Sequence, residues 1–131
     1  MTTEQGVHVP TRSSEPRGIE LIEERFEPGG LTLVVNGELD IATAPALRER
    51  LNAAIDAGTH RLVIDLTSLS FLDSVALATI VHAKQRLPEE GRMAIAIDPS
   101  SYVMLVFESG GLPRVLDLVE TRDEAIELVS R

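Results

Sequence analysis

The sequence contains no cysteine and no tryptophan, and its 131 residues include only three phenylalanines and one tyrosine. The lack of cysteine excludes a disulfide framework, a thiolate zinc site and a cysteine nucleophile. Because aromatic residues make up only 3% of the chain, the core must be built from Leu, Val, Ile and Ala. No apolar run approaches the roughly 20 residues that a helix needs to span a bilayer, so we expect no membrane insertion.

Positive charge is also scarce: the chain has 12 Lys and Arg residues and 21 Asp and Glu residues, which gives a formal net charge of −9. Binding to nucleic-acid phosphates or to an anionic membrane would work against this field. We therefore predict no nucleic-acid partner, and a basic protein surface is the easier match. The first residues have no apolar centre such as a secretory signal requires, which predicts a cytoplasmic protein.

The length is that of one domain with one modest core. Residues 1–18 are rich in Thr, Ser, Glu, Pro and Gly and show no hydrophobic period, so we predict a disordered N-terminal arm followed by a domain over residues 19–131. No HExxH, GxxxxGK[ST] or GxGxxG motif occurs, and the sequence therefore predicts neither a cofactor nor a metal site.

From residue 19 onward the hydrophobic period alternates between that of strands and that of helices. It predicts strands at 19–26, 31–35, 61–66, 93–97 and 114–116, and helices at 44–57, 74–87 and 100–109, with a last helix opened by the capping box Thr121–Glu124. The predicted fold is α/β, with a mixed sheet of four to five strands and four helices in the order β-β-α-β-α-β-α-β-α. The first two strands form an antiparallel hairpin.

Two loops at the carboxyl ends of predicted strands are candidate sites, residues 36–43 and 67–74. Asp40, Asp65 and Asp73 lie at or near such ends, and together they could hold Mg²⁺ or accept a phosphoryl group in an enzyme. Each aspartate alone is more simply a turn or cap residue. We therefore predict that the protein is not an enzyme.

The segment 69–77 follows a buried strand and opens an amphipathic helix, with Asp73 or Ser74 at the N-cap. Its neighbours complete a pattern of short motifs: Gly37-Glu38-Leu39-Asp40, Thr43-Ala44, Val63-Ile64-Asp65-Leu66, Phe71-Leu72-Asp73-Ser74 and Gly110-Gly111-Leu112. In order and spacing these motifs resemble the STAS domain of anti-sigma factor antagonists. The resemblance covers the chain from about residue 19 onward.

The resemblance implies a partner switch. The dephosphorylated domain is expected to bind an anti-sigma factor that is also a serine kinase, and thereby to free a sigma factor. The kinase phosphorylates Ser74 and the complex dissociates, after which a serine phosphatase restores the active form. A hydroxyl at a helix start suits this role, because the free N–H groups there tolerate a phosphate that adds about −1.5 to −2 charge.

The same resemblance implies a contact surface for the partner, formed by Asp40, Ile41, Thr43, Asp73, Ser74, Val75 and Ala76. The chain departs from the usual Asp-Ser-Ser/Thr-Gly-Leu pattern, because Val75 and Ala76 replace the second hydroxyl residue and the glycine. A STAS domain that is not phosphorylated is the alternative, either as a scaffold in a stress-signalling assembly or as a subunit of a lipid-transport ATPase.

Overall fold

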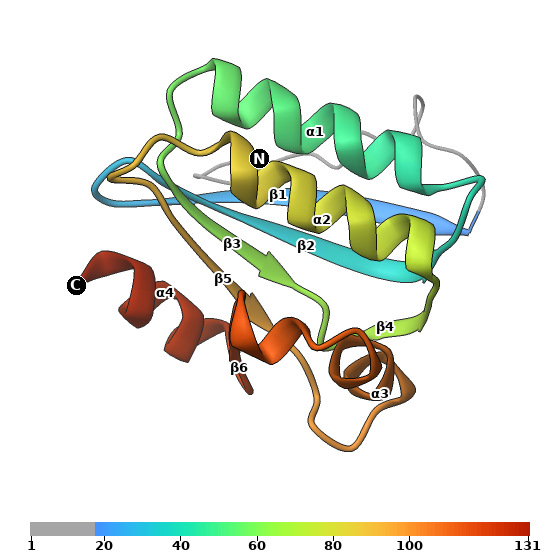
Figure 1. The fold of residues 1–131 in the computed structure, drawn as a ribbon. Helices are drawn as coiled ribbons and strands as arrows, with labels where there is room; N and C mark the ends of the chain where they lie inside the picture. Colours follow the sequence, from blue (N-terminus) through green and yellow to red (C-terminus); the bar gives the residue numbers. More distant parts are fainter. Residues whose placement is uncertain (1–17) are drawn as a thin grey trace, which may run out of the picture.

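The computed structural model describes residues 18–131, which form a mixed β-sheet with helices on both faces (Figure 1). The elements in chain order are β1 (Ile19–Phe26), β2 (Gly30–Leu39), α1 (Ala44–Asp56), β3 (Arg61–Asp65), β4 (Leu69–Leu72), α2 (Ser74–Arg86), β5 (Arg92–Ala96), α3 (Tyr102–Ser109), the 3-10 turn η2 (Leu112–Arg114), β6 (Asp117–Val119) and α4 (Arg122–Ser130).

Strands β1 and β2 form the predicted antiparallel hairpin, and the other pairings in the sheet are parallel. The strand order is β1-β2-β3-β5-β6, and β4 also pairs with β2. Strand β3 pairs with β2 as far as Val34, and β4 pairs with it from Gly37 to Leu39. The long strand β2 therefore carries β3 and β4 one after the other along the same edge.

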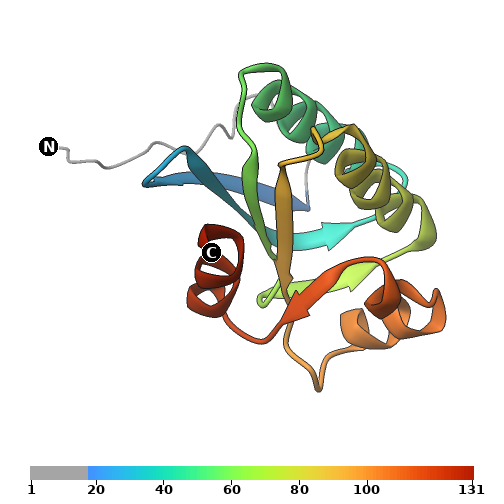
Figure 2. The same ribbon diagram turned by 60° about the vertical axis from the view of Figure 1, so that its left-hand side comes forward.

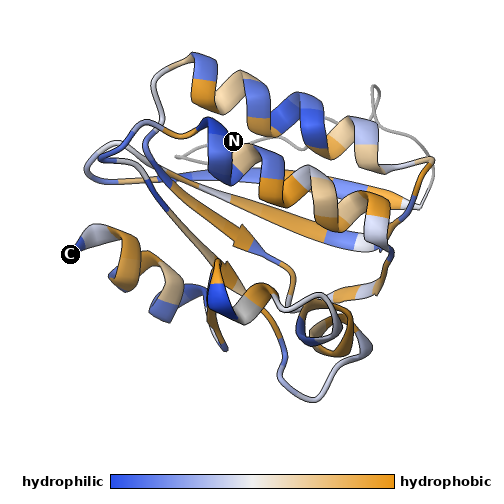
Figure 3. Cartoon of the chain, in the orientation of Figure 1, coloured by the Kyte–Doolittle hydropathy of each residue, from blue (hydrophilic) through white to orange (hydrophobic). Residues whose placement is uncertain are grey.

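Helices α1 and α2 lie side by side on one face of the sheet, and α4 lies on the opposite face (Figures 1 and 2). In Figure 3 the strands and the inner sides of the helices are largely orange, the colour of hydrophobic residues. The larger core cluster contains buried Leu, Ile and Val of the sheet with Leu47, Leu51, Ile80 and Phe107. A smaller cluster beneath α4 consists of Val63, Ala94, Ala96, Ala125 and Val129. Apart from Met93 and Phe107, the buried members of both clusters are the Leu, Val, Ile and Ala that the sequence predicted.

Local sequence explains where the helices begin. Pro45 occupies the first turn of α1, where its missing N–H leaves no bond unmade. Thr121 and Glu124 form the predicted capping box at α4, with each side chain accepting a hydrogen bond from the backbone of the other residue. All four predicted helices are present.

The sheet departs from the sequence prediction at two places. It has six strands rather than four or five, because β4 was expected to be part of a loop. The strand predicted at 114–116 is wrong: Gly111, at φ 71°, leads into the turn η2, and the strand follows at β6. Helix α3 begins at Tyr102 with Ser101 as its cap, slightly later than predicted.

The predicted arm, residues 1–18, lies outside the described residues except for Gly18, whose carbonyl accepts a hydrogen bond from the Glu38 amide at 2.8 Å. Within residues 18–131 no helix has the length and apolar character that crossing a membrane requires.

Candidate functional site

The two candidate loops lie next to each other because they follow neighbouring parallel strands. Leu39 and Leu72 are register partners at the ends of β2 and β4. Directly after this pair, the Asp73 amide donates a hydrogen bond to the Leu39 carbonyl at 3.1 Å. The backbone therefore places the loop that begins at Asp40 beside the start of α2.

Ser74 is the first residue of α2 and is exposed to solvent. Asp73 is the N-cap, and its Oδ1 accepts hydrogen bonds from the amides of Val75 and Ala76, both at 3.0 Å. The Ser74 hydroxyl makes no hydrogen bond to any residue in the range 18–131. Because Asp73 satisfies the first turn of the helix, that hydroxyl is left accessible for chemistry.

The loop after β2 is held closed by its own polar side chains. Asp40 Oδ1 accepts hydrogen bonds from the amides of Ala42 and Thr43 at 2.9 and 3.0 Å. Thr43 is buried, and its Oγ1 donates to the Glu38 carbonyl at 2.8 Å and accepts from the Asp40 amide at 2.9 Å. These bonds fix the loop in a shape that leaves Ile41, 72% exposed, at its tip.

The predicted contact residues therefore divide into three groups. Ile41, Ser74 and Val75 are exposed and can meet a partner directly. Asp40 and Asp73 are partly buried and cap their own loops. Thr43 and Ala76 are buried, so their side chains support the surface from below and present nothing to a partner.

An apolar surface that the sequence did not predict adjoins Ser74. Phe71 of β4 and Tyr102 of α3 stack with their ring centroids 5.9 Å apart, and both are exposed. Beside them an open groove of about 430 Å³ runs between α2 and α3, and we call it the α2–α3 groove. It is lined by Ser74, Leu77, Tyr102, Leu105, Val106, Ser109 and Gly110. Leu105 is 60% exposed and, with Phe71 and Tyr102, gives this part of the surface three exposed apolar side chains, and clustered exposed apolar side chains are typical of a surface that meets a partner.

One feature of the sequence, the apolar run in α3, indicates this surface. Six consecutive residues of α3, from Tyr102 to Phe107, are apolar or aromatic, which is more than one buried face of a helix needs. Only Val103 and Phe107 of this helix are buried in the core. The remaining apolar side chains had to lie elsewhere, partly on the surface.

The third candidate aspartate, Asp65, is buried and turned toward α4. Its Oδ1 accepts hydrogen bonds from the Thr67 amide and hydroxyl at 2.9 and 2.7 Å, and its Oδ2 lies 2.8 Å from the Arg122 guanidinium. Burial alone would raise the pKa of Asp65, but these hydrogen bonds and the Arg122 charge outweigh it and hold the pKa below its usual value. Arg122 also reaches Glu24 at 2.8 Å.

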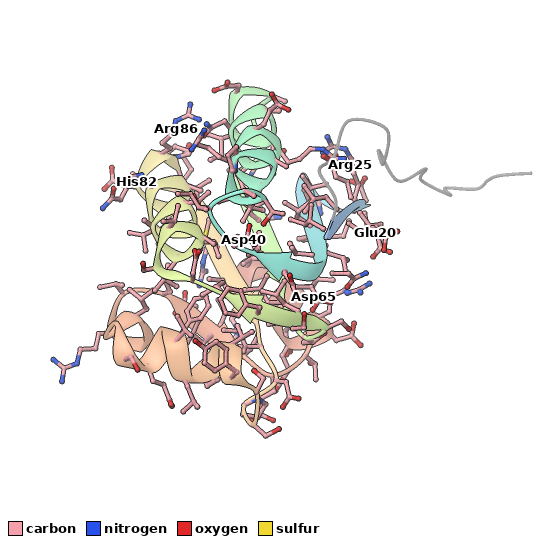
Figure 4. All side chains as sticks on the ribbon, turned by 90° about the vertical axis from the view of Figure 1, so that its right-hand side faces the viewer. Glu20, Arg25, Asp40, Asp65, His82 and Arg86 are labelled. Carbon is pink, nitrogen blue, oxygen red and sulfur yellow. The ribbon has the colours of Figure 1, made fainter. Side chains whose placement is uncertain are left out.

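The three aspartates thus serve three separate purposes: Asp40 closes a loop, Asp73 caps α2, and Asp65 ties β3 to α4 (Figure 4 labels the first and the last). Within residues 18–131 no three His, Asp or Glu side chains lie where they could jointly hold a metal ion. The arrangement offers a surface for recognition, with one exposed hydroxyl, that of Ser74, at its edge.

Known proteins match both the sequence and this fold. The family model of the STAS domain matches residues 22–125, which is most of the chain, so the chain belongs to the STAS domain family. STAS anti-sigma factor antagonists are in general regulatory proteins rather than enzymes.

Several similar proteins are anti-sigma factor antagonists. An anti-sigma-B factor antagonist of Staphylococcus epidermidis is 29% identical over 86 residues, which cover 66% of this chain and 80% of the relative. The crystal structure of an anti-sigma factor antagonist from Mycobacterium paratuberculosis matches with a TM-score of 0.81 and 29% identity, over 90% of this chain and 99% of the other. SpoIIAA in its unphosphorylated form shares the fold, with a TM-score of 0.65 and 24% identity over 84% of this chain and 97% of the other.

Proposed function

We propose that this protein is a cytoplasmic anti-sigma factor antagonist that phosphorylation at Ser74 switches off. The unphosphorylated form binds an anti-sigma factor with serine-kinase activity, which releases a sigma factor. The kinase transfers the γ-phosphoryl group of ATP to the Ser74 oxygen, ADP leaves, and the complex dissociates. A serine phosphatase later restores the binding form. The observation that carries the proposal is the exposed Ser74 hydroxyl, free of hydrogen bonds within residues 18–131, at the first position of α2.

A phosphate at this position disturbs recognition more than folding. Ser74 is exposed, and the N-terminus of α2, a helix of 13 residues, favours negative charge. The fold can therefore accommodate the added group. A partner that covers the α2–α3 groove would instead have to desolvate about −1.5 to −2 charge beside the carboxylate of Asp73.

A relative supports the phosphorylation step. SpoIIAA of Bacillus has also been solved in a phosphorylated form, which matches this chain with a TM-score of 0.64 and 25% identity over 83% of its length. The unphosphorylated and phosphorylated forms of that protein match this chain with nearly the same TM-score. This is the behaviour expected of a switch that changes a surface and leaves the fold intact.

The contact surface we propose consists of the tip of the first loop, the start of α2 and the α2–α3 groove. Its exposed apolar members are Ile41, Phe71, Val75, Tyr102 and Leu105. Val75 increases the apolar area beside the phosphoacceptor, whereas Ala76 is buried and leaves the outline of the surface unchanged. Of the two departures from the family pattern, we therefore assign a change in partner recognition to Val75.

The test uses purified protein and a serine-kinase anti-sigma factor encoded in the same genome, incubated with Mg²⁺ and ATP. Intact mass is expected to rise by one phosphoryl group, and peptide mapping should place it on Ser74. Ser74→Ala should gain none. Ser109→Ala, which removes another exposed hydroxyl from the lining of the groove, should be phosphorylated normally. Undiminished phosphorylation of Ser74→Ala would remove the central claim.

Binding variants then separate charge from contact. Ser74→Asp should weaken the complex with the kinase by about tenfold or more, equivalent to about 1.4 kcal/mol. Leu105→Ser should weaken it without adding any charge, because it removes an exposed apolar contact. Equal affinity of Ser74→Ala and Ser74→Asp, together with no phosphorylation, would favour the alternative of a STAS scaffold or transport-ATPase subunit.

A further inference from the structure

The layer formed by α1 and α2 carries positive charge, unlike the remainder of this acidic chain. Helix α2 contains Lys84 and Arg86 and no acidic residue. Helix α1 has two arginines, which balance its two acidic residues. The two helices together are therefore net positive, although the whole chain carries −9. A surface with this local sign attracts a different partner from the rest of the molecule.

A groove of about 360 Å³ runs between these two helices, and we call it the α1–α2 groove. It is lined by Arg48, Leu51, Asn52, Thr79, His82, Ala83, Gln85 and Arg86. Leu51, Thr79 and Ala83 are buried and form its floor. The charged and polar side chains stand around this floor, so the groove combines a largely apolar base with a rim that carries two arginines, Arg48 and Arg86.

Hydrogen bonds hold the rim side chain Arg86 in place, whereas Arg48 and His82 have no such bonds within residues 18–131. Arg86 donates hydrogen bonds to Asn52 at 2.6 Å and to Asp56 at 2.7 Å, which bridges the C-terminal ends of the two helices. Arg48 and His82 make no hydrogen bond or ion pair with any residue in the range 18–131. Figure 4 shows His82 and Arg86 on the same helix, at the far end from Asp40.

We propose that the α1–α2 groove docks an acidic protein segment that also carries apolar side chains. Carboxylates of the segment pair with the guanidinium group of Arg48 at the rim, and an apolar side chain lies on Leu51 and Ala83. A short acidic segment touches only this positive layer. A nucleic acid is a less suitable occupant, because its continuous chain of phosphates would also meet the negative surface around the groove.

This docking is separate from the switch. Ser74 and Arg86 are the two ends of a 13-residue helix, and the rise of 1.5 Å per residue places them about 18 Å apart. A segment in the α1–α2 groove can therefore be bound whether or not a partner occupies the surface around Ser74. The two sites can also be tested independently.

The test uses the full chain and a fluorescein-labelled peptide of repeated Glu-Glu-Leu triplets, with a Gln-Gln-Leu peptide as control. Fluorescence anisotropy should show binding of the acidic peptide that weakens as salt is raised, and no binding of the neutral peptide. In ¹⁵N NMR spectra the shifted amides should belong to α1 and α2. Amide shifts confined to other elements would overturn the proposal.

Variants make the assignment specific. Arg48→Glu should weaken peptide binding by about fivefold, since it replaces an exposed attraction by a repulsion. Arg25→Glu makes the same charge change at an exposed position of β1 and should leave binding unchanged. Equal losses in Arg48→Glu and Arg25→Glu would show only a general charge effect and refute docking in the groove. Displacement of the peptide by ATP or single-stranded DNA would assign the groove to phosphate ligands instead.

Discussion

The ion pair between Asp65 and Arg122 predicts a measurable, pH-dependent part of the stability. Asp65 has a side chain only 4% exposed, whereas that of Arg122 is 38% exposed, and their atoms lie 2.8 Å apart. In Arg122→Gln the buried carboxylate keeps its hydrogen bonds from Thr67 but loses the charge that balances it. Breaking a fully buried pair costs about 3–5 kcal/mol and an exposed pair about 0–1, so with Arg122 partly in water we expect about 1–2 kcal/mol.

The sign of the pH dependence follows from the native pKa of Asp65. Burial raises this pKa, but the bonds from Thr67 and the Arg122 charge lower it below the ordinary value. A carboxyl whose native pKa is depressed contributes stability above its unfolded pKa of about 3.9 and loses it as the pH falls through the native value. The difference between the native chain and Arg122→Gln should therefore be full at neutral pH and shrink below about pH 4.

Urea unfolding followed by circular dichroism, repeated from neutral pH to about pH 3, measures this difference. Arg25→Gln is the matched control, because it removes the same charge from an exposed position on β1. The reasoning fails if, at neutral pH, Arg122→Gln unfolds at the same urea concentration as the native chain. It also fails if Arg25→Gln loses as much unfolding free energy as Arg122→Gln. A difference that grows toward acid would refute the assigned pKa direction.

Two further substitutions test the architecture of the site. Asp73→Ala should cost about 1 kcal/mol of unfolding free energy, because the amides of Val75 and Ala76 lose their acceptor. Asp73→Asn, whose side-chain oxygen can still accept, should retain most of the native stability in the same urea assay. Gly37→Ala should cost more than about 2 kcal/mol, since its φ is 103° and a Cβ would lie 2.1 Å from the Gly18 carbonyl oxygen. Gly58→Ala, at φ 95° but facing open space, should lose clearly less in thermal unfolding. Equal losses at the two glycines would contradict the close approach.

The parts of the fold that sequence predicted are those set by local chemistry. Ser74 was expected to begin a helix, and it does, because an aspartate beside an amphipathic period supplies the cap. Strand β4 was not expected, since two of its four residues, Ser70 and Phe71, are exposed and a run this short shows no clear alternation. The strand β6 was displaced because Gly111 allows a left-handed turn that leads into η2.

The candidate site shows the same division. The resemblance of their own loops to the family predicted Ile41 and Ser74 as site residues, and the structure places both on the surface. The α2–α3 groove depends on Tyr102 and Leu105 meeting α2, and the α1–α2 groove depends on Arg48 lying across from His82. Both are contacts between elements whose relative placement the sheet decides, and no pattern within one helix reveals them.

The order in which β3 and β4 follow β2 has a mechanical consequence. Strand β3 is held on both edges, with five register pairs to β2 and five to β5. Strand β4 has three pairs to β2 and no other strand beside it within the part of the chain that the structure describes. Detaching the segment that leads to Ser74 therefore breaks fewer strand pairings than displacing β3. Under the proposed function, Ser74 could then shift toward the kinase while the rest of the sheet keeps its shape.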